Sequence, residues 1–249
     1  MATGISIDLS GRRTVITGGA KGAGADMVDL FLRAGADVLA VDIDGEALDR
    51  LKAAHPSVDT IVANVAVGEE ADRIVAAAGE RLDVLVNNAG ILDRLALVDE
   101  VTEDEWRRVF DVNLTGPYLL CNRVVPKMVA QGGGVIVNIA SLAGVRGGRA
   151  GAAYTASKHG LVGLSANIAA TFGNQGVRCV ALCPGGMTTG MDRGGVVSER
   201  GSKLVGRDRD LNATGPASEV AGVALFLASD LAIRINGSVV MADNGAVAF

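Results

Sequence analysis

The stretch from Thr14 to Gly24, which reads TVITGGAKGAG, decides the fold of this 249-residue chain. Its first four residues, 14–17, are typical of a buried strand, and the glycine-rich turn after them opens a segment with helical spacing, 24–34. Glycines in such a turn let the backbone bend sharply and approach a pyrophosphate closely. The start of the helix adds unpaired N–H groups and the positive end of its dipole. We therefore expect a strand–turn–helix unit that binds the phosphates of a dinucleotide.

Short β-branched runs alternate with helical patterns along the rest of the chain. Further strands are expected at 38–41, 60–62, 84–86, 135–139, 177–182 and 238–241. Further helices are expected at 45–54, 69–78, 103–130, 152–172 and 217–227, the first of them capped by Asp44. Because this alternation requires crossover connections, the strands should run parallel. The sequence predicts an α/β fold of the doubly wound Rossmann type, with a seven-stranded, mostly parallel sheet flanked by helices on both faces.

Length and composition are consistent with one domain over residues 1–249. No Pro/Ser-rich or charged linker divides the chain, and its 34 glycines and few aromatic residues fit tight turns between aliphatic strands. The segment 186–215 differs, because it is dense in glycine and mixed charge and interrupts the strand–helix rhythm. An insertion of that length in a compact domain is usually functional, so we interpret it as a mobile substrate lid. An inert solvated loop is the alternative.

Charge and cysteine content argue against several functions. The net charge of −5 disfavours binding to nucleic acid or to an anionic membrane surface, since both need a concentrated basic surface. The longest uncharged stretch, 159–177, contains polar residues and predicts a buried helix rather than a membrane span. Cys121, Cys179 and Cys183 lack metal-ligand spacing, so no metal site is expected. Their odd number, and an N-terminus unlike a signal peptide, favour reduced thiols in the cytoplasm.

Asp42 sets the expected cofactor preference. It ends the second expected strand about 20 residues beyond the glycines, where a carboxylate accepts both ribose hydroxyls and repels a 2′-phosphate. Lys21 acts in the opposite direction, since a cation in the glycine turn can pair with that phosphate. We give Asp42 more weight because it would lie directly against the phosphate. The expected cofactor is therefore NAD rather than NADP.

Tyr154 and Lys158 are the candidates for acid–base chemistry. They are four residues apart on an expected helix and therefore share a face. A free phenol titrates near pH 10, and a neighbouring cation lowers its pKa by stabilising the phenolate. Ser141, just after the strand 135–139, is suited to donate a hydrogen bond to a substrate oxygen as charge develops there. Because Tyr-x-x-x-Lys is common by chance, the pair needs supporting motifs.

Those motifs are present, and through them the chain resembles the short-chain dehydrogenase/reductase family, in its compact single-domain branch, over nearly its whole length. The matching blocks are Thr17-Gly-x-x-x-Gly22-x-Gly24, Asn87-Asn88-Ala89-Gly90, Asn113, Ser141, Tyr154-x-x-x-Lys158, and Pro184-Gly185 with Thr189. The resemblance implies that Tyr154 is the general acid/base and that Lys158 lowers its pKa and binds the nicotinamide ribose. It also implies that Ser141 orients the substrate oxygen and that Asn113 completes a water-linked proton relay.

The resemblance further implies a set of cofactor contacts and an assembly. The expected contacts are Thr17, Gly18, Gly19, Lys21, Gly22, Ala23, Gly24, Asp42, Ile43, Asn64, Val65, Asn88, Ala89, Gly90, Tyr154, Lys158, Pro184, Gly185, Met187 and Thr189. The expected assembly is a homotetramer built on the helices at 103–130 and 152–172, with a second contact near the C-terminus.

Two departures from the family pattern bear on the site. Asn64 stands where the family usually has an Asp that contacts adenine, which keeps a hydrogen-bonding group but loses the charge. Arg149 takes the place of a common Pro, and Arg146 is close to it in the same loop. One hypothesis is that either arginine contacts an anionic group of the substrate. The alternative is a solvated loop charge.

The expected function is NAD(H)-dependent transfer of a hydride between the cofactor and a secondary alcohol or ketone. Three alternatives stay open: an activity like that of 3-oxoacyl-thioester reductases, an epimerase or dehydratase that retains NAD through its cycle, and a non-catalytic NAD-binding protein. Because the substrate depends on the side chains of the expected lid, the sequence does not choose among secondary alcohols.

Overall fold

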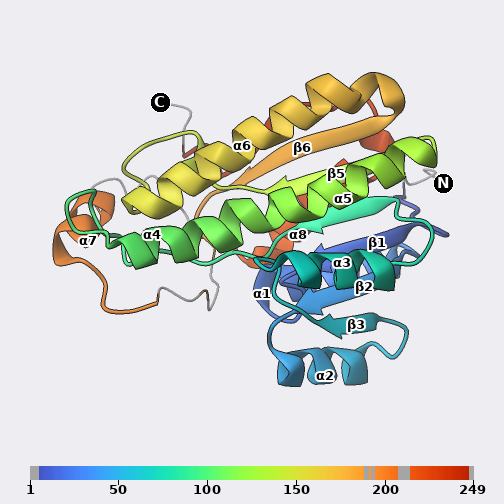
Figure 1. Ribbon diagram of the computed structural model, residues 1–249, viewed down its shortest axis with the longest axis horizontal. Coiled ribbons are helices and arrows are strands. Elements are labelled where there is room, and N and C mark those ends of the chain that lie inside the picture. The colour runs from blue at the N-terminus through green and yellow to red at the C-terminus, as the bar shows by residue number, and fades with distance from the viewer. Residues whose placement is uncertain (1–5, 188–190, 192–193, 207–213, 247–249) are drawn as a thin grey trace, which may run out of the picture.

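The computed structural model describes residues 6–187, 191, 194–206 and 214–246. Within them, seven strands form one sheet in the order β3-β2-β1-β4-β5-β6-β7 (Figure 1). The strands are β1 Arg13–Thr17, β2 Asp37–Asp42, β3 Asp59–Val62, β4 Val84–Asn87, β5 Gly134–Ile139, β6 Val177–Pro184 and β7 Val239–Ala242. Every neighbouring pair is parallel, which confirms the predicted doubly wound sheet.

Helices cover both faces of this sheet. They are α1 Gly22–Arg33, α2 Gly45–Ala54, α3 Gly68–Ala77, α4 Glu103–Phe110, α5 Gly116–Ala130, α6 Ala152–Phe172, α7 Glu199–Gly206 and α8 Ala217–Ala228. Two apolar cores result, one formed with α1, α2 and α8 and the other with α3, α5 and α6. No helix in the described part of the chain is long and apolar enough to cross a bilayer.

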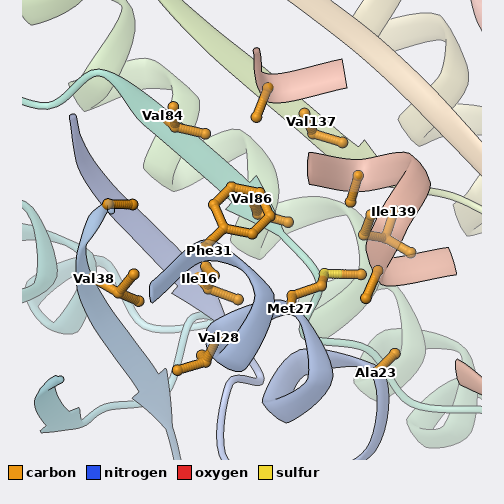
Figure 2. Close-up of a cluster of buried hydrophobic side chains, with 14 of the residues drawn as sticks. Ile16, Ala23, Met27, Val28, Phe31, Val38, Val84, Val86, Val137 and Ile139 are labelled. Carbon is orange, nitrogen blue, oxygen red and sulfur yellow. The ribbon is translucent and has the colours of Figure 1, made fainter. Parts of the chain in front are cut away.

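The strands are apolar on both faces because both are covered. Neighbouring residues of β1 show this, since Ile16 belongs to the core under α1 and Val15 to the core on the opposite face. Figure 2 shows the first of these cores, where Met27 and Phe31 of α1 lie among the strand side chains Val86 and Ile139. Because both faces of each such strand are buried, consecutive residues of the strand have to be aliphatic.

The long helix expected at 103–130 is present with these bounds and contains one irregular turn. Between α4 and α5, the turn Asp111–Thr115 is π-helical, with the Gly116 N–H donating to the Asp111 carbonyl. A π-turn inserts one extra residue into a helix and is often found at functional sites. The predicted helix is therefore confirmed, and the π-turn within it was not predicted, because residue pattern alone does not distinguish a π-turn from an α-turn.

The segment 186–215 contains a helix that was not expected. α7 lies within it, and the Ser198 N–H just before α7 donates to the Arg94 carbonyl at 2.7 Å. Gly201 of α7 packs so closely on the Leu95 carbonyl that a Cβ atom there would overlap the oxygen. Residues 188–190, 192–193 and 207–213 of this segment are outside the described part of the structure.

The sheet order reverses between β1 and β4, which are neighbours although two strands separate them in sequence. In an open parallel sheet, such a reversal leaves a crevice at the carboxyl ends of the strands, where ligands bind. β1 ends at Thr17 and β4 at Asn87, directly before the glycine turn and the Asn88-Ala89-Gly90 block. The topology therefore brings these two motifs together.

Candidate active site

A cavity of about 290 Å³ lies at this crevice. Its lining contains predicted residues from both halves of the site, namely Gly18, Lys21, Gly22, Ala23, Gly24, Asp42, Ile43, Asn64, Val65, Asn88, Ala89, Gly90, Tyr154, Lys158 and Met187. It also contains residues that were not predicted, namely Val41, Ala63, Ile91, Val112, Ile139, Ala140 and Met191. Most of these added residues lie at strand ends or next to a predicted motif, which is the signal that would have found them.

The glycine turn approaches its surroundings so closely that side chains would not fit. Gly18 has φ +61°, and a Cβ atom there would be 2.9 Å from the Ala89 Cα. A Cβ atom on Gly24 would overlap the Gly18 carbonyl oxygen. The first turn of α1 lines the cavity, which places backbone N–H groups and the positive end of the helix dipole at its wall. This cradle fits the pyrophosphate of a dinucleotide.

Thr17 and Asn88 join the glycine turn to the end of β4. The Thr17 hydroxyl accepts from the Asn88 and Ala89 N–H groups, both at 3.0 Å. The Asn88 side-chain amide donates to the carbonyls of Thr17 at 2.9 Å and Gly18 at 3.1 Å. Thr17 itself is buried and does not line the cavity, and Gly19 also lies outside the lining. Thr17 and Gly19 were predicted to contact the cofactor, and in the structure they instead support the residues that line the cavity.

Asp42 and Asp44 form a small acidic corner at the end of β2. The Asp42 carboxylate accepts from the Ala20 and Asp44 N–H groups, each at 3.1 Å. Asp44 caps α2, as expected, by accepting from the Ala47 N–H at 2.9 Å. Its other oxygen forms an ion pair with Lys21, which holds the pKa of Asp44 below its usual value. Lys21 was considered in the sequence as a ligand of a 2′-phosphate. Its ammonium is paired instead with Asp44, which the sequence predicted only as the cap of α2.

Apolar and amide groups line the adjoining part of the cavity. Ile43 follows Asp42 and has 72% of its surface exposed, which is unusual for an isoleucine and leaves a flat apolar face for an aromatic ring. Asn64 accepts from the Ala66 N–H at 3.0 Å through its carbonyl oxygen. Both Asn64 and Val65 line the cavity.

Tyr154 and Lys158 share the buried face of α6, as their spacing predicted. Tyr154 is 7% exposed and Lys158 is 3% exposed, and both line the cavity. The ammonium Nζ atom lies 5.6 Å from the centre of the phenol ring and donates to the Ile139 carbonyl at 2.8 Å. Burial lowers the pKa of Lys158 to about 8, because a charged ammonium is poorly solvated there.

Asn113 lies in the π-turn and is completely buried. Its carbonyl oxygen accepts from the Ile91 N–H and its amide donates to the Ile91 carbonyl, both at 2.9 Å. An ideal Cβ atom built on Gly90 would lie 3.3 Å from the Asn113 Oδ1 atom and 3.5 Å from the Lys158 Nζ atom. The structure therefore brings Asn113 and Lys158 to the same glycine at the cavity wall.

Ser141 is placed by the short turn that follows β5. It caps the 3₁₀ turn Leu142–Gly144, its hydroxyl accepting from the Ala143 N–H at 3.1 Å. This turn packs against α6, since a Cβ atom on Gly144 would lie 2.9 Å from the Lys158 carbonyl oxygen. Ser141 is half-buried and does not belong to the cavity lining. A hydroxyl that accepts one hydrogen bond can still donate another.

The remaining predicted residues belong to the end of β6 and the segment that follows it, which the resemblance assigns to the nicotinamide end of the cofactor. Met187 lines the cavity together with Met191. Pro184 ends β6, and the N–H of Gly185 donates to the Ala242 carbonyl at 3.0 Å. Neither Pro184 nor Gly185 belongs to the cavity lining. Thr189 is outside the described residues.

The two arginines of the loop before α6 lie in different surroundings. Arg146 is exposed, whereas Arg149 is half-buried and its guanidinium donates to the Ala246 carbonyl at 3.4 Å. Neither lines the cavity. Among the described residues, no group of three His, Cys, Asp or Glu side chains could hold a metal ion, and the three cysteines are buried and free.

Comparison with known proteins adds independent information. Residues 12–197 match the family model "short chain dehydrogenase". The chain is 40% identical over 248 residues to 3beta-hydroxysteroid dehydrogenase 2 of Eggerthella lenta, with 95% of each chain covered. It is 37% identical to the short-chain dehydrogenase/reductase cdmF of Talaromyces verruculosus, with 92% of this chain and 94% of that one covered.

Solved structures are similar over almost the whole length. The crystal structure of levodione reductase has a TM-score of 0.86 at 34% identity and covers 96% of this chain and 99% of its own. A second crystal structure, provisionally assigned as an NAD(P)-dependent gluconate 5-dehydrogenase of Beutenbergia cavernae, holds NADP at low occupancy. Its TM-score is 0.84 at 36% identity, with 97% of this chain and 99% of that chain covered.

Proposed function

The chain belongs to the short-chain dehydrogenase/reductase family, which makes it an oxidoreductase with a nicotinamide cofactor, and from this premise we propose that it transfers a hydride between NAD(H) and a secondary alcohol or ketone. One observation carries the proposal. The phenol of Tyr154 and the ammonium of Lys158 line the same cavity as the glycine turn and Asp42. A proton-exchanging pair beside a dinucleotide site is the arrangement that alcohol oxidation requires.

In the proposed oxidation, the Tyr154 phenolate accepts the hydroxyl proton of the alcohol. Lys158, 5.6 Å from the ring centre, favours the phenolate by its positive charge. Ser141 donates a hydrogen bond to the substrate oxygen and holds it near the phenol. Asn113, buried beside Lys158, is proposed to pass protons onward through water. The bound nicotinamide ring supplies the remaining chemistry, because it accepts the hydride in oxidation and donates it in reduction.

The acidic corner supports NAD over NADP. Asp42 lies at the end of β2 in the cavity lining, where its charge opposes a 2′-phosphate. Lys21 would favour that phosphate, but its ion pair with Asp44 already compensates its charge. The NADP in the similar Beutenbergia cavernae structure belongs to that protein, and the preference of this chain is the subject of the test below.

For the substrate, we propose alicyclic secondary alcohols, with hydroxysteroids as the first to examine. The relative from Eggerthella lenta is named a 3beta-hydroxysteroid dehydrogenase. The cavity that Tyr154 lines is also lined by Ile91, Met187 and Met191, which offer apolar and adaptable surface to an alicyclic ring. The segment 186–215, which carries both methionines and α7, is proposed as the lid over this substrate within a single-domain chain.

We also propose a homotetramer in a reducing, cytoplasmic compartment. Trp106 on α4 and Tyr118 on α5 are exposed, and so are Phe226 on α8 and Ile233 shortly after it in the C-terminal part of the chain. Exposed aromatic and aliphatic residues in such groups favour contact with another copy. Three buried, free cysteines fit a reducing compartment. Light scattering at several protein concentrations tests the assembly, and a monomer at all of them would contradict it.

The decisive experiment measures cofactor reduction with a panel of secondary alcohols that includes 3β-hydroxysteroids, with NAD and NADP in paired assays. We expect turnover with NAD and a lower kcat/KM with NADP. Tyr154→Phe removes the proton-exchanging oxygen but little volume, so kcat should fall by about 10²-fold to 10⁴-fold while NAD still binds. Turnover of the variant at the wild-type rate would remove Tyr154 from the mechanism.

A further inference from the structure

Asp93 is a buried carboxylate that the proposed mechanism does not use. It lies after β4, between the Asn88-Ala89-Gly90 block and α4, and its side chain is completely buried. Both oxygens accept hydrogen bonds from backbone N–H groups. Oδ1 accepts from Leu95 and Gly151, each at 3.1 Å, and Oδ2 accepts from Tyr154 at 2.9 Å. One of the three donors is thus the backbone of the proposed acid/base residue.

These hydrogen bonds define the first turn of α6. The helix begins at Ala152, so Gly151 immediately precedes it and Tyr154 is its third residue. The N–H groups of a first turn have no partners within the helix, and a carboxylate satisfies them well. Gly151 also has to be a glycine here, since a Cβ atom would overlap the Asp93 carboxylate. The start of α6 is therefore fitted around the Asp93 side chain and the Ala96 carbonyl, which accepts from the Ala152 N–H at 2.9 Å.

The segment that carries Asp93 is also held by contacts with residues outside α6. Ile91, two residues before it, exchanges two hydrogen bonds with the Asn113 side chain. Arg94, the next residue, forms an ion pair with the buried Glu105 of α4 at 3.0 Å, and Glu105 also accepts from the Arg94 N–H. Leu95 adopts φ +57°, a conformation that non-glycine residues rarely take unless their surroundings impose it.

We propose that Asp93 is a positioning residue for Tyr154. It connects the first turn of α6 to the segment that binds Asn113, and in this way it fixes the phenol relative to Lys158 and Asn113. The inference rests on the proposed function, because the position of the phenol affects the reaction only if Tyr154 exchanges a proton with the substrate. It adds a residue that acts on the reaction only through another side chain.

Asp93→Asn tests the proposal with little change in volume. Asparagine has one acceptor oxygen, which can keep the bonds from Leu95 and Gly151, but its NH₂ group would then face the Tyr154 N–H, another donor. The chain has only two tyrosines, Tyr118 and Tyr154. In a Tyr118→Phe background, ultraviolet titration of phenolate absorbance therefore reports on Tyr154 directly and needs neither substrate nor cofactor.

The direction in which the titration midpoint of Tyr154 shifts distinguishes a positioning effect from an effect of the Asp93 charge. If Asp93 holds the phenol near Lys158, the substitution weakens the attraction between phenolate and ammonium, and the titration midpoint of Tyr154 should rise by about half a pH unit or more. If the negative charge of Asp93 acted alone, its removal would lower the midpoint. A lowered midpoint, or one that does not move, would overturn the proposal.

Turnover gives the second measurement. In Asp93→Asn, kcat should fall about 10-fold or more, while the KM for the alcohol and the Kd for NAD stay within about twofold, because misplacement of the phenol affects the reaction step. An unchanged kcat would also overturn the proposal. If the Tyr118→Phe protein with Asp93 intact reduces no NAD with any alcohol, the proposed function fails, and the phenol titration still decides whether Asp93 positions Tyr154.

Asp83→Asn is the matched control. Asp83 is also buried, accepts from the Arg13 N–H at 2.9 Å and pairs with Arg81 at 2.6 Å, but it lies before β4 at the opposite end of that strand. Its substitution should lower the melting temperature without changing kcat or the Tyr154 midpoint. Equal effects from the two substitutions would mean that general loosening, rather than positioning, explains the Asp93 result, and would overturn the proposal.

Discussion

Two regions meet at the cavity but are built in different ways: the glycine cradle, residues 18–24, and a cluster around α6 that consists of Asp93, Asn113, Tyr154 and Lys158. The cradle is one continuous stretch of chain, and its shape depends on backbone clearances at Gly18 and Gly24. The cluster depends on hydrogen bonds between distant residues, such as Asp93 to Tyr154, 61 positions apart, and Ile91 to Asn113, 22 positions apart. We therefore expect substitutions that add atoms to the cradle to weaken NAD binding, and substitutions that remove atoms from the cluster to lower turnover.

The largest effect is expected in the cluster. Lys158→Met keeps the side-chain length but removes the ammonium that favours the Tyr154 phenolate, so kcat near neutral pH should fall by about 10²-fold or more. Measurement of kcat against pH should also show activity recovering at high pH, where the phenol ionises unaided. Lys127→Met on α5 is the control and should leave kcat unchanged. Wild-type turnover in Lys158→Met would contradict the proposed role.

The same substitution should stabilise the cofactor-free protein. Burial lowers the pKa of Lys158 from 10.5 to about 8, so the folded state holds this proton less tightly than the unfolded state does. The resulting cost to stability is fully present below pH 8 and disappears as the pH rises toward 10.5. Lys158→Met should therefore raise the free energy of unfolding at pH 7 by up to about 3 kcal/mol, with a smaller gain at pH 9. Urea unfolding at both pH values measures this, and a gain that grows with pH would be inconsistent with a buried charge.

A single methyl group should disrupt the cradle. Gly24→Ala places a Cβ atom against the Gly18 carbonyl oxygen, and the turn must shift to accommodate it. We expect the Kd for NAD, measured by calorimetry, to rise about 10-fold or more. Gly163→Ala on α6 is the control, because open space surrounds that position, and it should bind NAD normally. Normal binding by Gly24→Ala would show that the cradle is more adaptable than its clearances indicate.

The acidic corner should set the choice of cofactor. Asp42→Ala removes a carboxylate from the cavity lining, so kcat/KM with NAD should fall about 10-fold while kcat/KM with NADP rises. Asp37→Ala, at the other end of the same strand, should change neither. Paired assays with both cofactors measure the ratio, and an unchanged ratio would separate Asp42 from cofactor choice.

The smallest effect is expected at Asp44. Asp44→Asn keeps a side chain that can cap α2 but removes the ion pair with Lys21. The released cation should improve kcat/KM with NADP by a few-fold, because an exposed ion pair contributes less than about 1 kcal/mol. Adding Lys21→Met should abolish the gain. If the gain persisted in the double variant, Lys21 would not be its source.

The contrast between the two regions also explains what the sequence could predict. The strands, the glycine turn and the position of Asp42 were predicted because each depends on a short stretch of residues. Tyr154 and Lys158 were found to share a face from their spacing alone. Asp93 was missed because its three hydrogen bonds reach partners up to 61 positions away, and no local pattern marks them. α7 was missed because it packs on the backbone of Leu95, which lies about a hundred residues before it.

The π-turn at Asp111–Thr115 limits how this chain can change length. It holds Asn113 beside Ile91, while the residues before it in α4 and after it in α5 follow regular helical geometry. Deletion of one residue there would convert the wide turn into a regular α-helical turn and leave α4 and α5 close to their present orientation about the helix axis. Asn113 would then leave its place beside Ile91. Natural variants should therefore keep the residue count of this turn, even where its side chains differ.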